Sequence, residues 1–353
     1  MHLDEPQSIR EGEHLNLDAL EVYLRHHFGR QDARLEVAQF PSGYSNLTYL
    51  LTFGGQALVL RRPPKGAENI SKGHDMGREF KVLKQVYSHF KQCPEPIIYC
   101  EDASIIGTPF FIMERVEGVI IRATDILTWK PEEARIWQEN MVQTLLNLHS
   151  IDIKATGLET LGKVENYLTR QIAGWRGRWE KAKTSEIASM DFASIWLETN
   201  LPTSPSPALL HNDFKYDNVV LNAANLTEIK AVLDWEMATV GDPLTDLGIM
   251  LSYITEATDA PNLLAFNLKP LQGGLTRQEI ADYYALKSGQ NIDNLVYYYV
   301  FGVFKLGVIV QQIYYRYKMG YTKDKRFASL GHIVYSYGEL AQKAIETGKI
   351  TGI

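Results

Sequence analysis

The polar segment that most constrains this chain runs Leu209-Leu210-His211-Asn212-Asp213-Phe214-Lys215-Tyr216-Asp217-Asn218-Val219-Val220-Leu221. Apolar runs flank a polar stretch in which Asp213 and Asn218 stand five positions apart. A further apolar run ends downstream at Asp234. Carboxylate and amide oxygens are the ligands that a hard divalent cation prefers, and a carboxylate can also act as a general base. The segment therefore predicts half of a phosphoryl-transfer site, with Asp213 as the catalytic base.

The overall composition is that of an ordinary globular protein. The 353 residues are 45% hydrophobic and 22% charged, which leaves room for two lobes with separate cores. The net charge of −6 disfavours a general nucleic-acid binder or a membrane-surface protein. Cys93 and Cys100 lie near apolar residues, so we expect buried thiols in a reducing, cytoplasmic setting. The most apolar segment, 295–310, is interrupted by Lys305 and is expected to be a buried helix.

The first third of the chain has the alternation that is typical of β-strands. Strands are expected at residues 35–40, 47–53, 57–61, 94–100 and 110–113. Gly54-Gly55 predicts a tight hairpin turn, and helices are expected at residues 17–28 and 74–90. Three antiparallel strands in immediate succession form a meander, which argues against a Rossmann-type fold.

The rest of the chain has mainly helical periodicity. Helices are expected at residues 131–149, 164–183, 189–199, 244–253, 276–288, 291–319 and 326–347. Residues 219–221 and 229–233 predict a β-hairpin that brings Asn218 and Asp234 together. We therefore expect an α+β protein of two lobes. Residues 1–115 form a small antiparallel β-lobe with one main helix, and residues 116–353 form a larger helical lobe with the catalytic loop and an acceptor pocket.

Each residue of the polar segment also has a plainer interpretation. Asp213 by itself would be a turn-capping carboxylate, since Asp is common in turns. Lys215 is expected to neutralise the transferring phosphoryl group, but a solvated loop lysine explains it equally well. His211 has no second His or Cys at zinc-ligand spacing, so its ring is expected to tie the loop to backbone or to a carboxylate. The occurrence of Asp213, Asn218 and Asp234 close together in the sequence favours the functional interpretation.

Taken together, these motifs resemble the signature of a known family. His211-x-Asp213-x4-Asn218, followed by Leu233-Asp234-Trp235-Glu236, is similar to the aminoglycoside phosphotransferase and choline kinase branch of the protein-kinase-like fold. The longer run from Asp234 to Leu247 resembles phosphotransferase domains related to those fused to acyl-CoA dehydrogenases. The resemblance covers almost the whole chain. It implies a protein-kinase-like two-lobe fold with ATP and Mg²⁺ as cofactors, and it implies Asn218 and Asp234 as the metal ligands.

The resemblance also implies a nucleotide site in the first lobe. The residues that it implicates are Ser42, Gly43 and Ser45 of a phosphate-covering loop, Val59 against adenine, Arg61 on the phosphates, Glu79 as the ion-pair partner of Arg61, and Met113, Glu114 and Val116 of the inter-lobe hinge. The family usually has Lys where Arg61 stands, and neighbouring Arg62 is an alternative for this role. A plain β-turn and a solvated helical Glu79 are the simpler interpretations.

The acceptor is the least constrained part of the prediction. Asp246 is expected either to accept backbone N–H bonds from the catalytic loop, as the family implies, or to cap a helix. The helix at 164–183 is basic and aromatic around Trp175 and Arg178, and the long later helix carries Tyr297 and Tyr298. Such a pocket would suit an anionic acceptor, whereas an aminoglycoside calls for an acidic one.

The expected function is transfer of the γ-phosphate of ATP to a hydroxyl group of a small molecule. A hydroxylated acyl-type or other anionic metabolite is preferred as the acceptor. An aminoglycoside or choline-type kinase and an inactive nucleotide-binding pseudokinase are the alternatives, and a metal-dependent hydrolase could use the same carboxylates. Neither nucleic acid nor membrane is an expected partner, and the sequence does not predict the oligomeric state.

Overall fold

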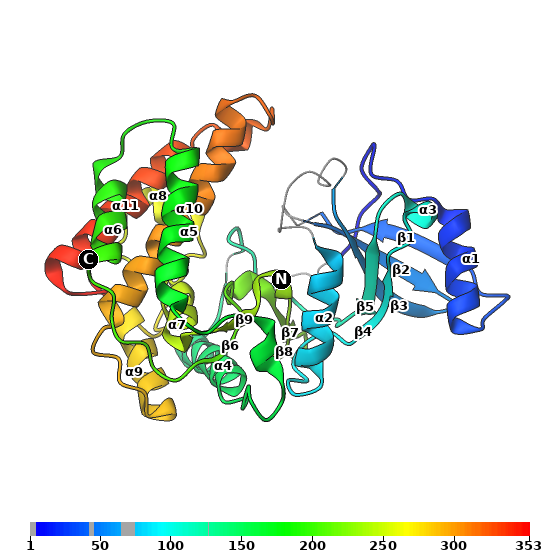
Figure 1. Cartoon of the computed structure of the whole chain (residues 1–353), viewed down its shortest axis with the longest axis horizontal. Coiled ribbons are helices and arrows are strands. Elements are labelled where there is room, and N and C mark those ends of the chain that lie inside the picture. The colour runs from blue at the N-terminus through cyan, green and yellow to red at the C-terminus, as the bar shows by residue number, and fades with distance from the viewer. Residues whose placement is uncertain (1–4, 42–45, 65–74, 126) are drawn as a thin grey trace. The chain divides into compact units, whose positions relative to one another are not determined.

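The structure, a computed structural model, describes residues 5–41, 46–64, 75–125 and 127–353. The chain forms two compact units that we describe separately (Figure 1). Unit 1 contains residues 1–120 and 219–237, and unit 2 contains residues 121–218 and 238–353. Residues 219–237 were expected in the second lobe. They join unit 1 because backbone hydrogen bonds link Val119 to Leu221 and Val232 to Gln92. The lobe boundary expected at residue 115 remains a prediction.

The core of unit 1 is a five-stranded antiparallel sheet in the order β1-β2-β3-β5-β4. Its strands are β1 (Leu35–Gln39), β2 (Leu47–Phe53), β3 (Gln56–Arg62), β4 (Pro96–Cys100) and β5 (Phe110–Glu114). Phe53 pairs with Gln56, and Gly54 and Gly55 both have positive φ. Two positive φ values in a two-residue turn match the twist of the strands, which confirms the predicted hairpin.

Two helices flank this sheet on opposite faces (Figure 1). The helices of unit 1 are α1 (Leu17–Phe28), α2 (Met76–Tyr87) and the short α3 (Ala103–Ile106). Leu58 and Leu60 of β3 enter the apolar core that Leu20 and Leu24 of α1 complete. Alternate side chains of a strand point to opposite faces, so Arg61 faces α2 instead. The guanidinium group of Arg61 therefore lies on the face of the sheet that α2 covers.

A second hairpin in unit 1 carries one of the predicted metal ligands. It consists of β7 (Val219–Asn222) and β8 (Asn225–Val232), with Val219 opposite Val232. Asn218 directly precedes the first of these paired residues in the chain, and Asp234 follows the second by two positions. The pairing of β7 with β8 confirms the predicted hairpin, and the expectation that it brings Asn218 and Asp234 together remains a prediction.

Unit 2 is mainly helical. Its helices are α4 (Pro131–His149), α5 (Tyr167–Ala182), α6 (Ala188–Thr199), α7 (Pro243–Ser252), α8 (Pro261–Phe266), α9 (Arg277–Ser288), α10 (Leu295–Lys318) and α11 (Leu330–Thr347). The strands β6 (Ala208–Leu210) and β9 (Thr239–Gly241) pair with each other. The sequence predicted neither β9 nor α8, because segments of three and six residues are too short for periodicity to emerge.

The long helix α10 crosses the centre of unit 2 and packs against α5, α6, α7 and α11. It is long and apolar enough to span a bilayer, but 78% of its apolar window is buried inside the unit, as expected for a core helix. Its contact with α7 is unusually close. A Cβ atom on Gly248 would lie 2.1 Å from the carbonyl oxygen of Tyr298, and one on Gly302 would lie 2.4 Å from that of Gly248. Only glycine permits this backbone contact.

Candidate active site

The predicted catalytic loop follows β6 and is anchored by Asp246 of α7. Oδ2 of Asp246 accepts the backbone N–H of His211 at 2.7 Å, and Oδ1 accepts that of Asn212 at the same distance. Asp246 is completely buried, and His149 at the end of α4 lies 3.4 Å from its Oδ2. Burial alone would raise the pKa of Asp246, but His149 and the loop N–H groups lower it below its ordinary value. The predicted loop-anchoring role of Asp246 is confirmed.

The residue before Asp213 has a backbone conformation that side chains other than glycine rarely adopt. Asn212 has a φ of 64°, in the left-handed region that Asn tolerates better than most residues. Two contacts hold it there: Tyr167 donates a 2.9 Å hydrogen bond to Oδ1 of Asn212, and Nζ of Lys305 donates to its carbonyl oxygen. Such conformations persist only where the surroundings over-determine them, and they are common at functional sites.

Three donors surround the carboxylate of Asp213. Asn218 donates from Nδ2 to Oδ2 at 2.9 Å, and Tyr253 donates from its hydroxyl to Oδ1 at 3.3 Å. Nζ of Lys215 lies 3.3 Å from Oδ2. Burial raises the pKa of Tyr253 well above its ordinary value, so its phenol keeps the proton that it donates. The carboxylate is thus held in one orientation while its side chain stays 16% exposed, which is the arrangement that a general base needs.

The structure shows where His211, Lys215 and Asn218 lie in this loop. Nδ1 of His211 accepts the backbone N–H of Asp213 at 3.2 Å, which confirms that the ring ties the loop to backbone. Asn218 uses Nδ2 for its bonds to Asp213, so these bonds do not engage Oδ1, the atom that would bind a cation. Lys215 also lies 3.5 Å from Asp217, so it contacts two carboxylates of the loop.

The predicted nucleotide residues of unit 1 centre on Arg61. Its guanidinium forms an ion pair with Glu79 of α2 and hydrogen bonds of 3.2 and 3.3 Å with Oδ1 of Asp234. The predicted pairing of Arg61 with Glu79 is confirmed. Arg62 instead donates to the hydroxyl of Tyr49 and to the carbonyl oxygen of Glu13. Arg61, and not Arg62, therefore faces the candidate site.

The charges around Arg61 favour its protonated form. Burial alone would lower the pKa of the Arg61 guanidinium, but the carboxylates of Glu79, Asp234 and Glu236 raise it above its ordinary value. Burial raises the pKa of Glu79 to about 7, against the opposing effect of Arg61. Asp234 has a φ of 67°, so each of the two predicted loops holds one residue in the left-handed region.

Sequence reasoning gave no role to several residues that support these groups. Glu236 accepts a hydrogen bond from Asn46 at 2.9 Å, and its carbonyl oxygen accepts one from Arg78 at 2.6 Å. Its position two residues after Asp234 was a usable signal. Lys305 was noticed only as an interruption of an apolar run. A lone charge in a buried helix signals a specific partner, but sequence could not identify that partner as Asn212.

The remaining predicted residues are only partly placed. Val59 lies opposite Met113 in the β3–β5 register, and both side chains are buried. Glu114 ends β5, and Val116 follows in the connecting segment. Their backbone contacts with an adenine ring remain a prediction. Ser42, Gly43 and Ser45 lie outside the described residues, so the phosphate-covering loop also remains a prediction.

Solved structures of known proteins identify the fold class of this chain. Unit 1 with its antiparallel sheet and unit 2 with its helices make up an α+β, protein-kinase-like fold. A protein of Ralstonia eutropha, provisionally assigned as an aminoglycoside phosphotransferase, superposes with a TM-score of 0.78 and 26% identity. The alignment covers 95% of this chain and 99% of that one. Choline kinase from Cryptosporidium parvum shares the fold, with a TM-score of 0.65, 14% identity and coverage of 94% and 97%.

The family follows from the sequence itself. The model of the phosphotransferase enzyme family matches residues 36–279, and the chain belongs to this family. Acyl-CoA dehydrogenase family member 11 of Rattus norvegicus is 38% identical over 313 residues, which is 86% of this chain. The chain spans only 40% of the length of that relative. Solved structures of an aminoglycoside phosphotransferase, each 17% identical to this chain, hold hygromycin B with ADP or with AMP-PNP.

Proposed function

We propose that this phosphotransferase moves the γ-phosphate of ATP to a hydroxyl group of a small molecule. The observation that carries the proposal is the carboxylate of Asp213, oriented by Asn218 and Tyr253 on a loop that Asp246 anchors. A carboxylate held in this way can orient an acceptor hydroxyl and accept its proton as the new O–P bond forms. The nucleotides in solved structures of this fold support ATP as the donor.

The side-chain chemistry of the two predicted ligands suits a Mg²⁺ ion shared with nucleotide phosphates. Asn218 and Asp234 supply one amide and one carboxylate oxygen, and Mg²⁺ is usually bound by one or two protein oxygens plus phosphates and water. Bound Mg²⁺ would neutralise charge on the β- and γ-phosphates. Arg61 would bind the α- and β-phosphates, and Glu79 would hold its guanidinium in place. Lys215 would stabilise negative charge on the transferring phosphoryl group.

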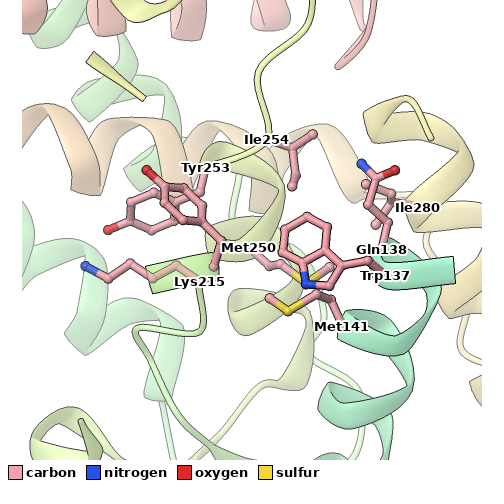
Figure 2. A pocket seen from close by; sticks show the side chains of 9 residues that line it. Trp137, Gln138, Met141, Lys215, Met250, Tyr253, Ile254 and Ile280 are labelled. Carbon is pink, nitrogen blue, oxygen red and sulfur yellow. The ribbon is translucent and has the colours of Figure 1, made fainter. Parts of the chain in front are cut away.

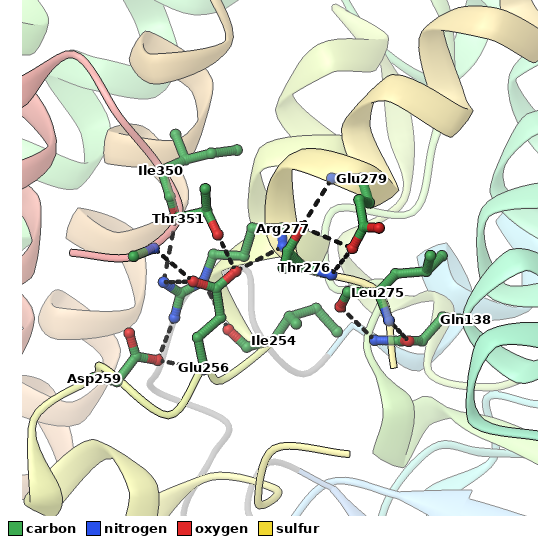
Figure 3. Close-up of polar contacts among 11 residues, drawn as sticks. Gln138, Ile254, Glu256, Asp259, Leu275, Thr276, Arg277, Glu279, Ile350 and Thr351 are labelled. Carbon is green, nitrogen blue, oxygen red and sulfur yellow. Dashed lines mark hydrogen bonds and ion pairs between the residues drawn. The ribbon is translucent and has the colours of Figure 1, made fainter. Parts of the chain in front are cut away.

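The charges of unit 2 support an acceptor that is not a polycation. Glu256 lines a cavity of this unit, but other groups already donate hydrogen bonds to its carboxylate (Figure 3). Thr351 donates to its Oε1 at 2.6 Å, and the backbone N–H groups of Arg277 and Gly352 donate at 2.8 and 2.9 Å. The guanidinium of Arg277 also lies 3.8 Å from Oε2 of Glu256 and balances its charge, which weakens the attraction for an amine. We therefore prefer a hydroxylated acyl-type or other anionic metabolite, and the likeness to acyl-CoA dehydrogenase relatives supports that choice.

The helix that first suggested an anionic acceptor has another role. Arg176 of α5 pairs with Glu198, and the indole N–H of Trp179 donates to Asp191 at 2.6 Å. Tyr297 and Tyr298 are core residues whose hydroxyls bond to Leu197 and Asp242. These side chains stabilise unit 2, so the preference for an anionic acceptor now depends on the cavity. A reducing, cytoplasmic location remains our proposal, and Cys93 and Cys100 are buried free thiols.

The test begins with nucleotide binding and proceeds to transfer. Mg-ATP at one hundred times its dissociation constant should stabilise the protein by about 2.7 kcal/mol in thermal unfolding. Consumption of ATP should then depend on an acceptor from a panel of hydroxyacyl-CoA compounds, aminoglycosides and choline. Efficient phosphorylation of kanamycin without activity on hydroxyacyl-CoA would support the aminoglycoside alternative. Binding of ATP without transfer to any acceptor would support the pseudokinase alternative.

A further inference from the structure

Unit 2 contains a cavity of about 320 Å³ beside the catalytic loop. Its walls come from α4, from the segment that follows α7, and from residues 268–276 and 351–352. Apolar side chains such as Ile254, Leu271 and Leu275 make up much of the lining. Polar side chains, among them Gln138, Glu256 and Lys269, complete the lining. A cavity of this size that combines apolar walls with polar groups is the usual form of a small-molecule site.

The cavity shares part of its lining with a second, smaller space. A narrow gap with room for about one water molecule adjoins it, and Trp137, Gln138, Tyr253 and Ile254 line both spaces. Lys215 lines the inner gap, and Figure 2 shows its side chain beside the ring of Tyr253. Both residues contact the carboxylate of Asp213, Tyr253 at 3.3 Å from Oδ1 and Lys215 at 3.3 Å from Oδ2. Two residues that line the inner gap therefore also contact the candidate base.

The polar side chains of this lining differ in their partners. Gln138 donates to the carbonyl oxygen of Leu275 at 3.2 Å and accepts the backbone N–H of Leu275 at 2.5 Å. The amide nitrogen and the amide oxygen of Gln138 therefore both have a partner. The carboxylate of Glu256 already accepts hydrogen bonds from Thr351, Arg277 and Gly352. The indole N–H of Trp137 is buried, with the residue 1% exposed, and has no hydrogen-bond partner among the described residues. Figure 2 shows this indole beside Met250, with its nitrogen on the side of Met141.

An indole N–H group that is buried without a partner can donate a hydrogen bond to a ligand that enters the site. Leaving such a group unpaired destabilises the protein, and a ligand oxygen that accepts its hydrogen bond would remove that cost. The alternative, that the indole is only a packing group, leaves its buried N–H group without an acceptor although the residue lines both spaces. Tryptophan N–H groups usually find a partner when they are buried.

We propose that the acceptor binds in this cavity and that the indole N–H of Trp137 is its hydrogen-bond anchor. This inference rests on the proposed phosphotransfer function. The ligand would present an oxygen atom, such as a carbonyl oxygen, to Nε1 of Trp137 and a hydroxyl group to Asp213, with its apolar part against Ile254, Leu271 and Leu275. Trp137 is thus a residue that selects the acceptor, and it leaves ATP binding untouched.

The test uses Trp137→Phe, which keeps an aromatic ring and removes the N–H donor together with part of the ring volume. With the best acceptor of the panel above, KM for the acceptor should rise about 10-fold, the equivalent of one ordinary hydrogen bond. KM for ATP should stay unchanged. Trp179→Phe is the matched control, because the indole N–H of Trp179 already donates to Asp191. It should lower stability without changing KM for the acceptor. An equal rise of both KM values in Trp137→Phe would overturn the anchor role.

A second measurement separates this inference from the function on which it rests. The six tryptophans give indole N–H signals in a ¹⁵N spectrum, and Trp137→Phe identifies the signal of Trp137. Added hydroxyacyl-CoA should shift that indole proton downfield even when ATP is absent. A shift without any phosphotransfer would support the binding site and reject the kinase function. Phosphotransfer without a shift would reject the anchor and leave the kinase function intact.

Discussion

The hydroxyl of Tyr253 donates a hydrogen bond to Oδ1 of Asp213, while Asn218 donates to the other carboxylate oxygen. Tyr253 comes directly after α7, and the same helix carries Asp246, which accepts the backbone N–H groups of the loop. One short helix and the residue after it therefore set both the backbone and the side chain of the candidate base. Such pre-orientation lowers the cost of reaching the transition state.

The first prediction concerns Asp213→Asn. The amide keeps the size of the side chain and can still meet Asn218 and Tyr253, but it cannot accept the proton of a hydroxyl group. We expect the rate of phosphotransfer to fall by about 10²–10⁴-fold, with Mg-ATP binding retained in a thermal-shift assay. Asp217→Asn is the control, because Asp217 also contacts Lys215 but does not face the proposed acceptor hydroxyl. Full turnover in Asp213→Asn would remove Asp213 from the base role.

The second prediction separates Arg61 from its neighbour. Arg61→Met would leave the buried carboxylate of Glu79 without its cation, which should cost roughly 3–5 kcal/mol of unfolding free energy. It should also raise KM for ATP by more than about 10-fold, since a charge-assisted phosphate contact is lost. Arg62→Met removes the contacts with Tyr49 and Glu13 and should change stability without changing KM for ATP. Equal KM values in the two variants would show that Arg61 does not bind phosphate.

Local sequence signals were sufficient for most of the architecture. The Gly54-Gly55 turn set the β2–β3 register. Successive side chains of a strand point to opposite faces of the sheet, so Leu60 and Arg61 were expected on different faces. The sequence placed Asp213 and Asn218 in one polar loop, and the structure adds a hydrogen bond between them. These features depend on neighbours in the chain, for which periodicity and turn chemistry are direct guides.

Contacts between distant segments were not predictable in the same way. Tyr253 lies 40 positions from Asp213, and Lys305 lies 93 positions from Asn212. No local pattern distinguishes the Tyr253 that reaches the base from the tyrosines of α10 that fill the core. The cavity was missed for the same reason, since its lining combines α4 with residues 268–276 and 351–352. Packing of whole helices decides which side chains meet there.

The third prediction concerns the anchor of the loop. Asp246→Ala leaves the backbone N–H groups of His211 and Asn212 buried without an acceptor, which should cost roughly 2–6 kcal/mol of unfolding free energy. Turnover per folded molecule should also fall, because Asp213 is no longer held in place. Asp242→Ala is the control, since Asp242 caps the same helix and bonds to Tyr298 but does not contact the loop. It should lower stability and leave turnover per folded molecule unchanged.

The last prediction concerns Lys305, which is 2% exposed and donates to the carbonyl oxygen of Asn212. Burial lowers the pKa of Lys305 from 10.5 to about 8, although the carboxylates of Asp213 and Asp246 oppose the change. Between about pH 8 and pH 10.5 the unfolded chain therefore binds more protons at this residue than the folded chain does, so stability from this residue rises with pH. Below pH 8 the full cost of the buried charge is present. The unfolding free energy of the natural chain relative to Lys305→Met should increase by roughly 3 kcal/mol from pH 7.5 to pH 10.5 in urea titrations. Other groups that titrate in this range affect both proteins equally, so they cancel when the two unfolding free energies are subtracted. A free-energy difference that does not change with pH would show that the folded protein stabilises the Lys305 ammonium as fully as water does.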